Sequence, residues 1–565
     1  MRLSFALATL SLLFAPAAGW AQAAPDATTP AFTAGRIRAH VEFLADDLLE
    51  GRNAGTHGHE IAARYVATRF EALGLKPAGT DGGWYQQVPL VEYALDPTVP
   101  AAITVGKQRF TNPGDLLVNA SAAGARFQSV TADAVFVGYG LDAPKYGFHD
   151  YDGVDVTGKF AVMLLGMPRN TPSAAFDALF SGKEEAARRH GARGVIFVLS
   201  PGILARISWD RLSGFFTRTE TAWVDAGGNP RGESADAPLT AYLSPRAGAA
   251  LLAGSPSESD AIFKVEAAGG KVPTFAIKQR PTISRMSTHR RFTSPNVLGV
   301  LPGSDPAVAD EYVVLMAHLD HEGTDPSLAG EDKIYNGAMD NAIGTATMLE
   351  VARGFAENGK RPRRSILFVS VTAEEDGLLG SDFLARHPLP GGGKVVGVVN
   401  LDMPVLLYDF TDVVAFGAEH STLGPIVAAA AAKEGVVLSP DPMPEENLFV
   451  RSDHYSFVQA GVPSVFLVTG FQNGGEKAFR DFLATNYHKV SDDLKQPIDW
   501  QAGAKFARIN YAIARDIAND AHAPRWYDGD EYGDRYAPGQ PRAPRPAPEK
   551  SPEKPGVAPD ASPVN

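Results

Sequence analysis

The sequence contains no cysteine in its 565 residues, which excludes disulfide bonds, a catalytic thiol and thiolate metal ligands. It also lacks a basic excess: 52 Lys and Arg residues stand against 65 Asp and Glu residues, a formal net charge of −13. A nucleic-acid partner is therefore not expected. After the N-terminal leader, no run reaches about 18 apolar residues, so we expect no stable membrane insertion. Any metal bound here must use His, Asp and Glu side chains.

Residues 1–23 have the pattern of a secretory signal peptide. Arg2 gives a positive start, residues 3–15 are apolar, and Ala21-Gln-Ala23 has the small-x-small form that a signal peptidase reads. We therefore expect an exported protein, located in the periplasm or outside the cell. Without disulfides its stability must come from a buried core.

The pattern of apolar, turn-forming and charged residues changes three times after the leader. Between about 130 and 278, short β-branched runs alternate with Gly and Pro turns, which predicts a compact β-rich unit. After residue 294, continuous apolar strands alternate with helical patterns, which predicts an α/β fold with a sheet buried on both faces. The expected organisation is a discontinuous catalytic domain at 30–125 and 285–522, an insert at 126–284, and a disordered Pro-rich tail at 523–565.

Side chains that bind metals follow three central strands of the predicted sheet. In an open α/β sheet, the carboxyl ends of the strands form the edge at which ligands bind. The strands and the residues that follow them are 312–317 with His318 and Asp320, 365–372 with Glu374 and Glu375, and 395–401 with Asp402. Asp340 precedes a predicted helix, and His488 lies in a later loop.

Two histidines and three carboxylates among these residues suit two zinc ions that share one carboxylate. Cobalt or manganese could replace zinc in such a set. Glu374 is left over beside a ligand and can act as the general base for a metal-bound water. Asp320 can accept the second ring N–H of His318 and so orient that ring. The five predicted ligands are His318, Asp340, Glu375, Asp402 and His488.

Five segments together resemble the secreted di-zinc aminopeptidase family, whose relatives include glutamate carboxypeptidase II and the non-enzymatic transferrin receptor. The resemblance covers about 36–90 and 290–520, and it implies a zinc-exopeptidase-like mixed, largely parallel sheet flanked by helices. The β-rich region is similar to the protease-associated domain that some members insert. The segments are Ala317–His321, Asn336–Gly344, Thr372–Ser381, Asn400–Met403 and Arg451–Phe457.

The resemblance also implies how the two zinc ions are held. Asp340 would bridge them. His318 and Asp402 would complete one zinc site, and Glu375 and His488 would complete the other.

The same resemblance assigns three further roles. Glu374 would be the base, Asp320 would orient His318, and Tyr455 is our candidate for the group that stabilises the oxyanion. His321 is interpreted as an ordinary polar histidine.

The function implied is a secreted zinc exopeptidase, first of all an aminopeptidase acting on peptides. A carboxypeptidase or dipeptidase on the same scaffold is the alternative, since Arg451 could clamp a substrate carboxylate. A non-catalytic binding protein of the transferrin-receptor kind would have broken ligand positions, whereas all five are present here. The oligomeric state stays open.

Overall fold

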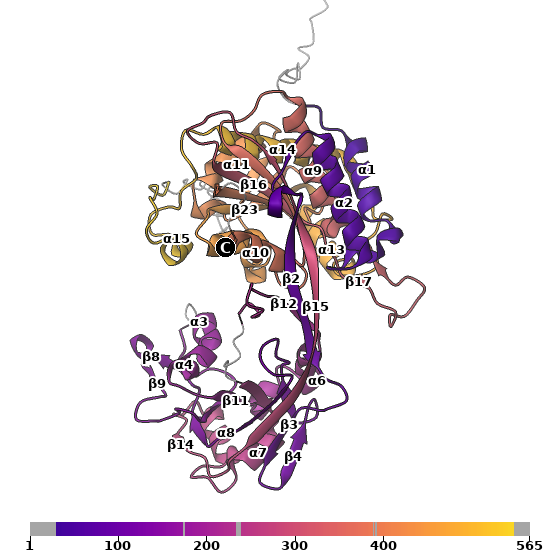
Figure 1. Cartoon of the computed structure of the whole chain (residues 1–565). Coiled ribbons are helices and arrows are strands. Elements are labelled where there is room, and N and C mark those ends of the chain that lie inside the picture. Colours follow the sequence, from indigo (N-terminus) through magenta and orange to yellow (C-terminus); the bar gives the residue numbers. More distant parts are fainter. Residues whose placement is uncertain (1–29, 173–175, 233–238, 388, 390–391, 547–565) are drawn as a thin grey trace, which may run out of the picture.

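The computed structural model describes residues 30–546, apart from 173–175, 233–238, 388, 390 and 391. Two units, each built on its own sheet, are joined by long strands (Figure 1). The expected signal peptide, residues 1–23, lies outside the described residues. Among the described helices, none combines the length and the hydropathy that crossing a membrane requires.

The main path of a thirteen-stranded sheet, nine strands long, forms the centre of the larger unit. Its four middle strands run parallel, and antiparallel strands extend it on both sides. The prediction of a mixed α/β fold is therefore confirmed. The main path of the sheet is β12 (Glu220–Trp223), β2 (Tyr85–Leu95), β15 (Thr282–Leu301), β19 (Ser365–Val371), β16 (Glu311–His318), β20 (Lys394–Leu401), β23 (Ser464–Thr469), β21 (Asp412–Phe416) and β22 (Val437–Ser439).

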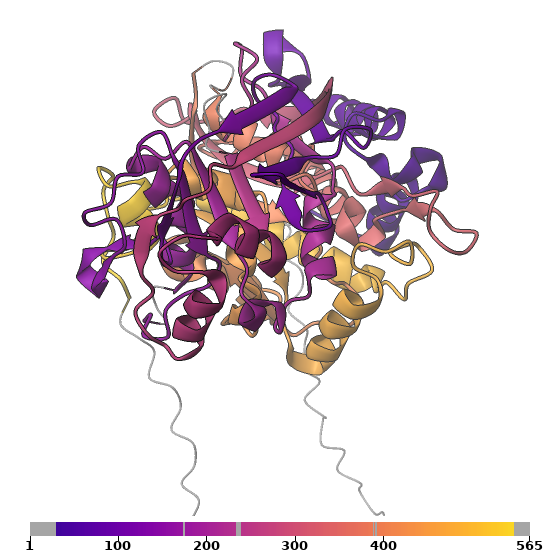
Figure 2. The same cartoon turned by 90° about the horizontal axis from the view of Figure 1, so that it is seen from below.

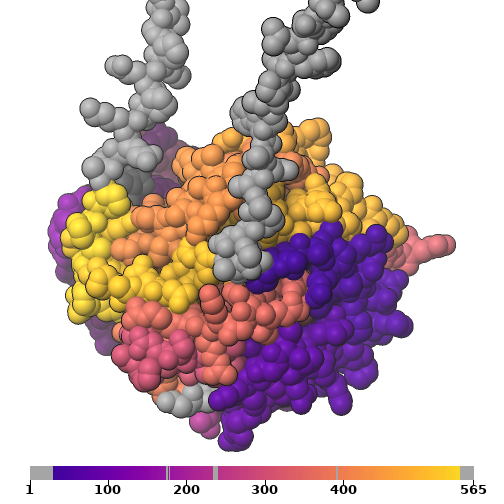
Figure 3. Space-filling model, turned by 90° about the horizontal axis from the view of Figure 1, so that it is seen from above, coloured from indigo at the N-terminus to yellow at the C-terminus, as the bar shows by residue number. Residues whose placement is uncertain are grey.

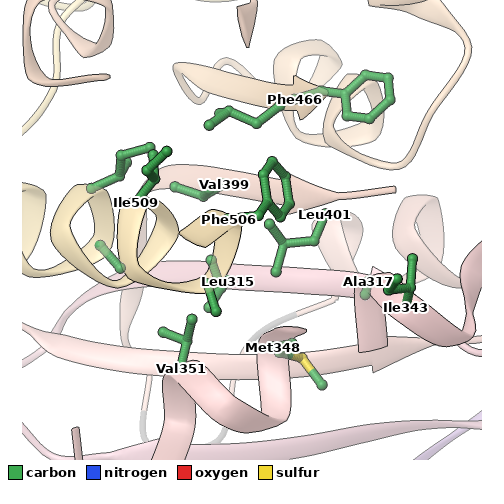
Figure 4. Packing of buried hydrophobic residues seen from close by; sticks show 14 of the residues in the cluster. Leu315, Ala317, Ile343, Met348, Val351, Val399, Leu401, Phe466, Phe506 and Ile509 are labelled. Atoms are coloured by element: carbon green, nitrogen blue, oxygen red, sulfur yellow. The ribbon is translucent and has the colours of Figure 1, made fainter. Parts of the chain in front are cut away.

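Helices cover both faces of this sheet, which explains why its central strands are apolar throughout. In β16, Val313 and Leu315 pack on one face and Val314 and Met316 on the other. Figure 4 shows the first face, where Leu315 meets the side chains of α14 and β20. The helices are α1 (Ala34–Leu44), α2 (His57–Ala72), α9 (Ile343–Glu357), α10 (Leu379–Arg386), α11 (Leu423–Ala432), α12 (His454–Gln459), α13 (Gly475–Thr485), α14 (Trp500–Asn519) and α15 (Glu531–Tyr536).

The N-terminal helices complete the core of this unit. Ile37 and Val41 of α1 and Phe70 of α2 are fully buried in the same apolar cluster as Ile509 of α14. Figure 3 shows this N-terminal segment, in indigo, lying directly against later parts of the chain. Helices α1 and α2 are thus an integral layer of the larger unit.

The smaller unit has a sheet of six strands and its own apolar core (Figure 2). Its four central strands are parallel and are accompanied by helices, so the predicted β-rich unit is an α/β unit. The sheet order is β14 (Thr274–Ala276), β7 (Ala134–Val137), β10 (Phe160–Leu164), β11 (Gly194–Val198), β13 (Leu239–Leu243) and β5 (Leu116–Val118). The helices are α3 (Phe176–Ser181), α4 (Lys183–Arg189), α5 (Pro201–Leu204), α6 (Trp209–Phe216), α7 (Pro245–Leu252) and α8 (Ser259–Ala267).

The smaller unit begins earlier than the predicted boundary at residue 126. Residues 101–118 belong to its core, because Leu116 and Val118 of β5 pack there and β5 pairs with β13. The short strands β3 (Ala102–Val105), β4 (Gln108–Thr111) and β6 (Phe127–Thr131) attach to the first part of β15. Composition alone missed this boundary because these strands are short and lie between polar turns.

Residues 523–546 fold against the larger unit, so the predicted disordered tail is wrong for this stretch. Trp526 is 1% exposed, and its indole N–H donates to the carbonyl of Gly461 at 3.0 Å. Asp530 accepts from the ring of His420 at 2.7 Å. The physical reason is that buried side chains, Trp526 and Tyr527 first among them, and main-chain hydrogen bonds to residues 420 and 422 hold a segment otherwise rich in proline and charge.

Candidate metal centre

The predicted ligands meet at one edge of the central sheet. Because β16, β19 and β20 are parallel neighbours, their carboxyl ends lie side by side. His318 ends β16, Glu374 and Glu375 follow β19, and Asp402 follows β20. Asp340 comes from the loop before α9.

The first half of the cluster is formed by His318, Asp340 and Asp402. Nε2 of His318 lies 3.2 Å from Oδ1 of Asp340 and 3.2 Å from Oδ1 of Asp402. The other carboxylate oxygen of Asp402 accepts from the hydroxyl of Ser452 at 2.6 Å, and that hydroxyl accepts from Asn400 at 2.6 Å. All three cluster residues are buried, so their ligand atoms are held by packing as well as by hydrogen bonds.

The second half of the cluster is formed around His488. Its Nε2 lies 3.3 Å from Oδ2 of Asp340 and 3.1 Å from Oε2 of Glu375. Its Nδ1 lies 3.1 Å from a carboxylate oxygen of Glu322, on the rim. The two oxygens of Asp340 therefore face two different histidines.

His321 also belongs to this neighbourhood, although the sequence interpretation left it as an ordinary polar histidine. It is fully buried, and its Nδ1 lies 2.6 Å from Oε1 of Glu375. It forms a possible ligand group with Asp340 and Glu375. Its position three residues after His318, in the same loop, was the signal that could have revealed it.

Glu374 lies beside the cluster, grouped with His318 and Glu375. A tight turn at Ala373, whose φ is 53°, follows β19 and directs the chain back into α10. Burial, together with the nearby carboxylate of Asp402, raises the pKa of Glu374 well above its usual value. A carboxyl group in such surroundings accepts a proton readily, as a general base must.

Asp320 does not orient His318 in the predicted way. Nδ1 of His318 faces the main-chain carbonyl of Asp320 at 3.1 Å. The Asp320 carboxylate instead accepts the main-chain N–H of Glu375 at 3.3 Å through Oδ2. The spacing of two residues brings the Asp320 backbone to the ring, so the orienting atom is a carbonyl and not the carboxylate.

Tyr455 lies apart from the pocket that the cluster lines. Its hydroxyl is 3.3 Å from the hydroxyl of Tyr536, and its ring packs near Phe449. The tyrosine that lines the pocket is Tyr487, directly before His488. Tyr455 lies in the first turn of α12. Its hydroxyl contacts Tyr536 of the C-terminal segment, whose folding the sequence did not predict.

The cluster forms the floor of a pocket of about 260 Å³. Its walls are apolar, and its mouth carries Glu446 and Arg451, whose charged groups are 3.6 Å apart. The apolar lining residues are Met403, Leu448, Phe466 and Leu483.

The residues present fit a pair of divalent cations. Imidazole nitrogens and carboxylate oxygens converge in two groups that share Asp340. Behind them, both carboxylate oxygens of buried Asp453 and one of buried Asp320 have no hydrogen-bond partner among the described residues. So much buried negative charge is costly unless cations balance it, and a mixed His and carboxylate set suits zinc.

Comparison with known proteins supports this interpretation. Residues 296–514 match the model of peptidase family M28. A probable zinc metalloprotease of Pyricularia oryzae is 27% identical over 256 residues, which are 40% of this chain and 50% of that protein. The aminopeptidase NAALADL1 of Mus musculus is 35% identical over 129 residues, which are 21% of this chain and 15% of that protein.

Among solved structures, the aminopeptidase from Aneurinibacillus sp. strain AM-1 is 20% identical with a TM-score of 0.48, covering 87% of this chain and 95% of that one. This chain spans 50 to 62% of the length of three similar fungal metalloproteases. The matched segment contains all five predicted ligands as well as Glu374. The part of the chain that carries the candidate metal centre is therefore similar to peptidase family M28.

Proposed function

We propose that this protein is an exported zinc-dependent exopeptidase that removes N-terminal residues from peptides. The observation that carries the proposal is the position of Asp340, whose two carboxylate oxygens face His318 and His488 separately. This arrangement suits one carboxylate shared between two metal ions. His318 and Asp402 would complete one metal site, and Glu375 and His488 the other.

These residues would hold two divalent ions, which when bound would supply polarisation of a water molecule and of the scissile carbonyl. Glu374 accepts the proton of the attacking water, because its buried carboxylate lies beside the cluster and gains stability on protonation. The same carboxyl group then delivers that proton to the leaving nitrogen. His321 holds Glu375 through its Nδ1 contact and so keeps Glu375 pointing at the cluster.

Tyr487 is the group that we assign to the developing oxyanion. Its ring centroid is 3.9 Å from that of His488, and it lines the pocket. A phenol hydroxyl fixed beside the reacting carbonyl stabilises negative charge that appears only in the transition state. Tyr455 is withdrawn from this role because its hydroxyl contacts Tyr536.

The walls of the pocket favour a substrate residue with an apolar side chain. Beyond the cluster, the pocket offers one acidic side chain, Glu446, which could receive a free ammonium group. Arg451 favours the alternative of a carboxypeptidase, since it could bind a terminal carboxylate. Arg451 and Glu446 pair with each other, with Nη1 at 3.6 Å from the carboxylate, so this contact favours neither alternative. We rank the aminopeptidase first because an aminopeptidase, NAALADL1, is among the similar proteins.

The experiment uses two short peptides that differ only in whether the N-terminus is free or acetylated. Each is incubated with the purified protein, with a chelator, and with zinc restored after the chelator. Release of the first residue from the free peptide only, lost with the chelator and regained with zinc, supports an aminopeptidase. Release of the last residue from both peptides equally identifies a carboxypeptidase. Bound zinc without cleavage of either would support a binding protein.

A further inference from the structure

One buried arginine outside the matched family segment reaches the loops that carry the predicted ligands. Arg52 ends the short helical turn η1 (Asp47–Arg52) and is 1% exposed. Its Nε donates to the carbonyl of Leu319 at 2.9 Å, its Nη1 to that of Asn336 at 2.6 Å, and its Nη2 to that of Gly337 at 3.1 Å. Nη1 also donates to the carbonyl of Leu44. Each of these acceptors is a main-chain carbonyl.

Three of these four acceptors lie close in sequence to two predicted ligands. Leu319 follows His318 directly, and residues 336 and 337 begin the loop that leads to Asp340. The turn itself is packed closely against the same region. A Cβ placed on Gly51 would lie 2.3 Å from the carbonyl oxygen of Gly323. The backbone of the turn that carries Arg52 therefore approaches Gly323 too closely for a side chain at position 51.

Asp492 holds the other end of the loop at 336–340. Its two carboxylate oxygens accept the main-chain N–H groups of Met339 at 3.0 Å and Asp340 at 2.9 Å. Asp492 lies four residues after His488, in the loop of that ligand. The segment that carries Asp340 is thus held by a cation at its carbonyls and by an anion at its amides.

We infer that Arg52 is a positioning residue for the metal pair. Together with Asp492, it fixes the loop at 336–340 so that the carboxylate of Asp340 faces both His318 and His488. This inference rests on the proposed metal site. By this inference the N-terminal segment, which precedes the residues that match the family model, helps to position the ligands of the metal centre.

The charge of Arg52 and its hydrogen bonds predict opposite effects on metal binding. A positive charge beside the cluster repels a divalent cation, so removing the charge alone would tighten binding. Removing the hydrogen bonds frees two ligand loops, which must then be ordered when the metal binds, and so weakens binding. Partners that orient metal ligands are typically worth about 10- to 100-fold in metal affinity.

The test measures zinc binding to the chelator-stripped full chain by equilibrium dialysis and elemental analysis. For Arg52→Met we expect binding of one or both ions to weaken by about 10- to 100-fold. Arg52→Lys keeps the charge but cannot replace the planar fork, so we expect a loss of similar direction. The matched control is Arg364→Met, which removes another arginine, 2% exposed, that donates to the carbonyl of Asp520 at 2.6 Å away from the cluster. Arg364→Met should bind zinc as the unchanged protein does.

Three outcomes would overturn the inference: unchanged affinity in Arg52→Met, tighter binding in Arg52→Met, or an equal loss in the Arg364→Met control. If Arg52→Met does not fold, Arg52→Lys decides, because unchanged affinity there contradicts the role of the fork. Two zinc ions must first be found in the unchanged protein. If they are absent, the proposed function is contradicted. This measurement on the unchanged protein tests the proposed function, whereas the variants test the role of Arg52.

Discussion

Glu374 and Glu375 are neighbours in the chain, but the pKa values of their carboxyl groups shift in opposite directions. Burial raises the pKa of Glu374 well above its usual value. Burial acts on Glu375 in the same direction, but hydrogen bonds from His321 and His488 outweigh it and lower the pKa to about 2. One carboxylate is therefore suited to accept a proton and the other to stay charged as a ligand.

Replacing Glu374 with Gln should remove most of the peptidase activity and leave zinc bound. Loss of a general base costs about 10²–10⁴-fold in turnover. Turnover on a free peptide and bound zinc should be measured on the same sample. Glu375→Gln is the matched variant, one residue away, and it should lose zinc together with activity. Full turnover in Glu374→Gln would refute the assignment of the base.

Tyr487→Phe should lower kcat more than it changes KM. The hydroxyl would act only on charge that develops in the transition state, and a donor of this kind is worth about 10²-fold in kcat. Tyr455→Phe is the control, because that hydroxyl contacts Tyr536. It should leave kcat unchanged. Steady-state kinetics of both variants decide between the two tyrosines, and a large loss in Tyr455→Phe alone would restore the assignment made from the sequence.

Trp526→Ala should destabilise the folded protein by about 3–5 kcal/mol, the range for removing a large buried aromatic side chain. The change also leaves the carbonyl of Gly461 without its indole partner. Arg535→Ala, at an exposed position of the same C-terminal segment, should change the free energy of unfolding by less than about 0.5 kcal/mol. Denaturant titration of both variants measures the difference. Equal stability would mean that residues 523–546 contribute nothing to the fold.

Lys183→Met should stabilise the protein at neutral pH, by an amount that shrinks as the pH rises. Lys183 is 1% exposed, and burial lowers its pKa from 10.5 to about 7. The unfolded chain therefore holds the proton more tightly, and the cost of burying the charge is complete below about pH 7 and relieved towards about pH 10.5. The cost is about 5 kcal/mol at most.

The contacts of Lys183 reduce this gain, because its ammonium donates to the carbonyls of Leu164, at 3.2 Å, and Gly166. The quantity to follow is the difference in free energy of unfolding between Lys183→Met and the unchanged protein across this pH range. Lys264→Met, at an exposed lysine of the same unit, is the control and should give a difference that does not vary with pH. A constant difference for Lys183→Met would contradict the burial argument.

The central sheet could be predicted from the sequence because its strands are buried on both faces and are apolar throughout. The ligands His318, Glu375 and Asp402 could be predicted for a related reason, since each lies at or shortly after the carboxyl end of such a strand. Their common location then depends only on parallel strands ending together.

Other parts of the site depend on tertiary contacts that no local pattern carries. Arg52 lies in a polar turn more than 260 residues before the loops it holds, as its bond to Leu319 shows. Asp492 looks like one of two ordinary loop aspartates until the fold brings it to the amide of Asp340. The prediction for the tail is wrong because composition averages over a segment, whereas a few residues such as Trp526 and Asp530 hold residues 523–546 against the larger unit.

The pairing of β2 with β15 would allow the smaller unit to be inserted or deleted as a whole. Leu95, at the end of β2, pairs with Ser287 of β15, so the chain leaves the central sheet and returns to it at neighbouring positions. Joining these two positions by a tight turn would convert the pair into a hairpin and delete the whole excursion between them. Of the strands on the main path of the central sheet, only β12, the edge strand beside β2, would be lost as a whole, and β3, β4 and β6 would leave with the first part of β15. The smaller unit is in this sense an enlarged hairpin loop, and the larger unit without it would keep all five predicted metal ligands.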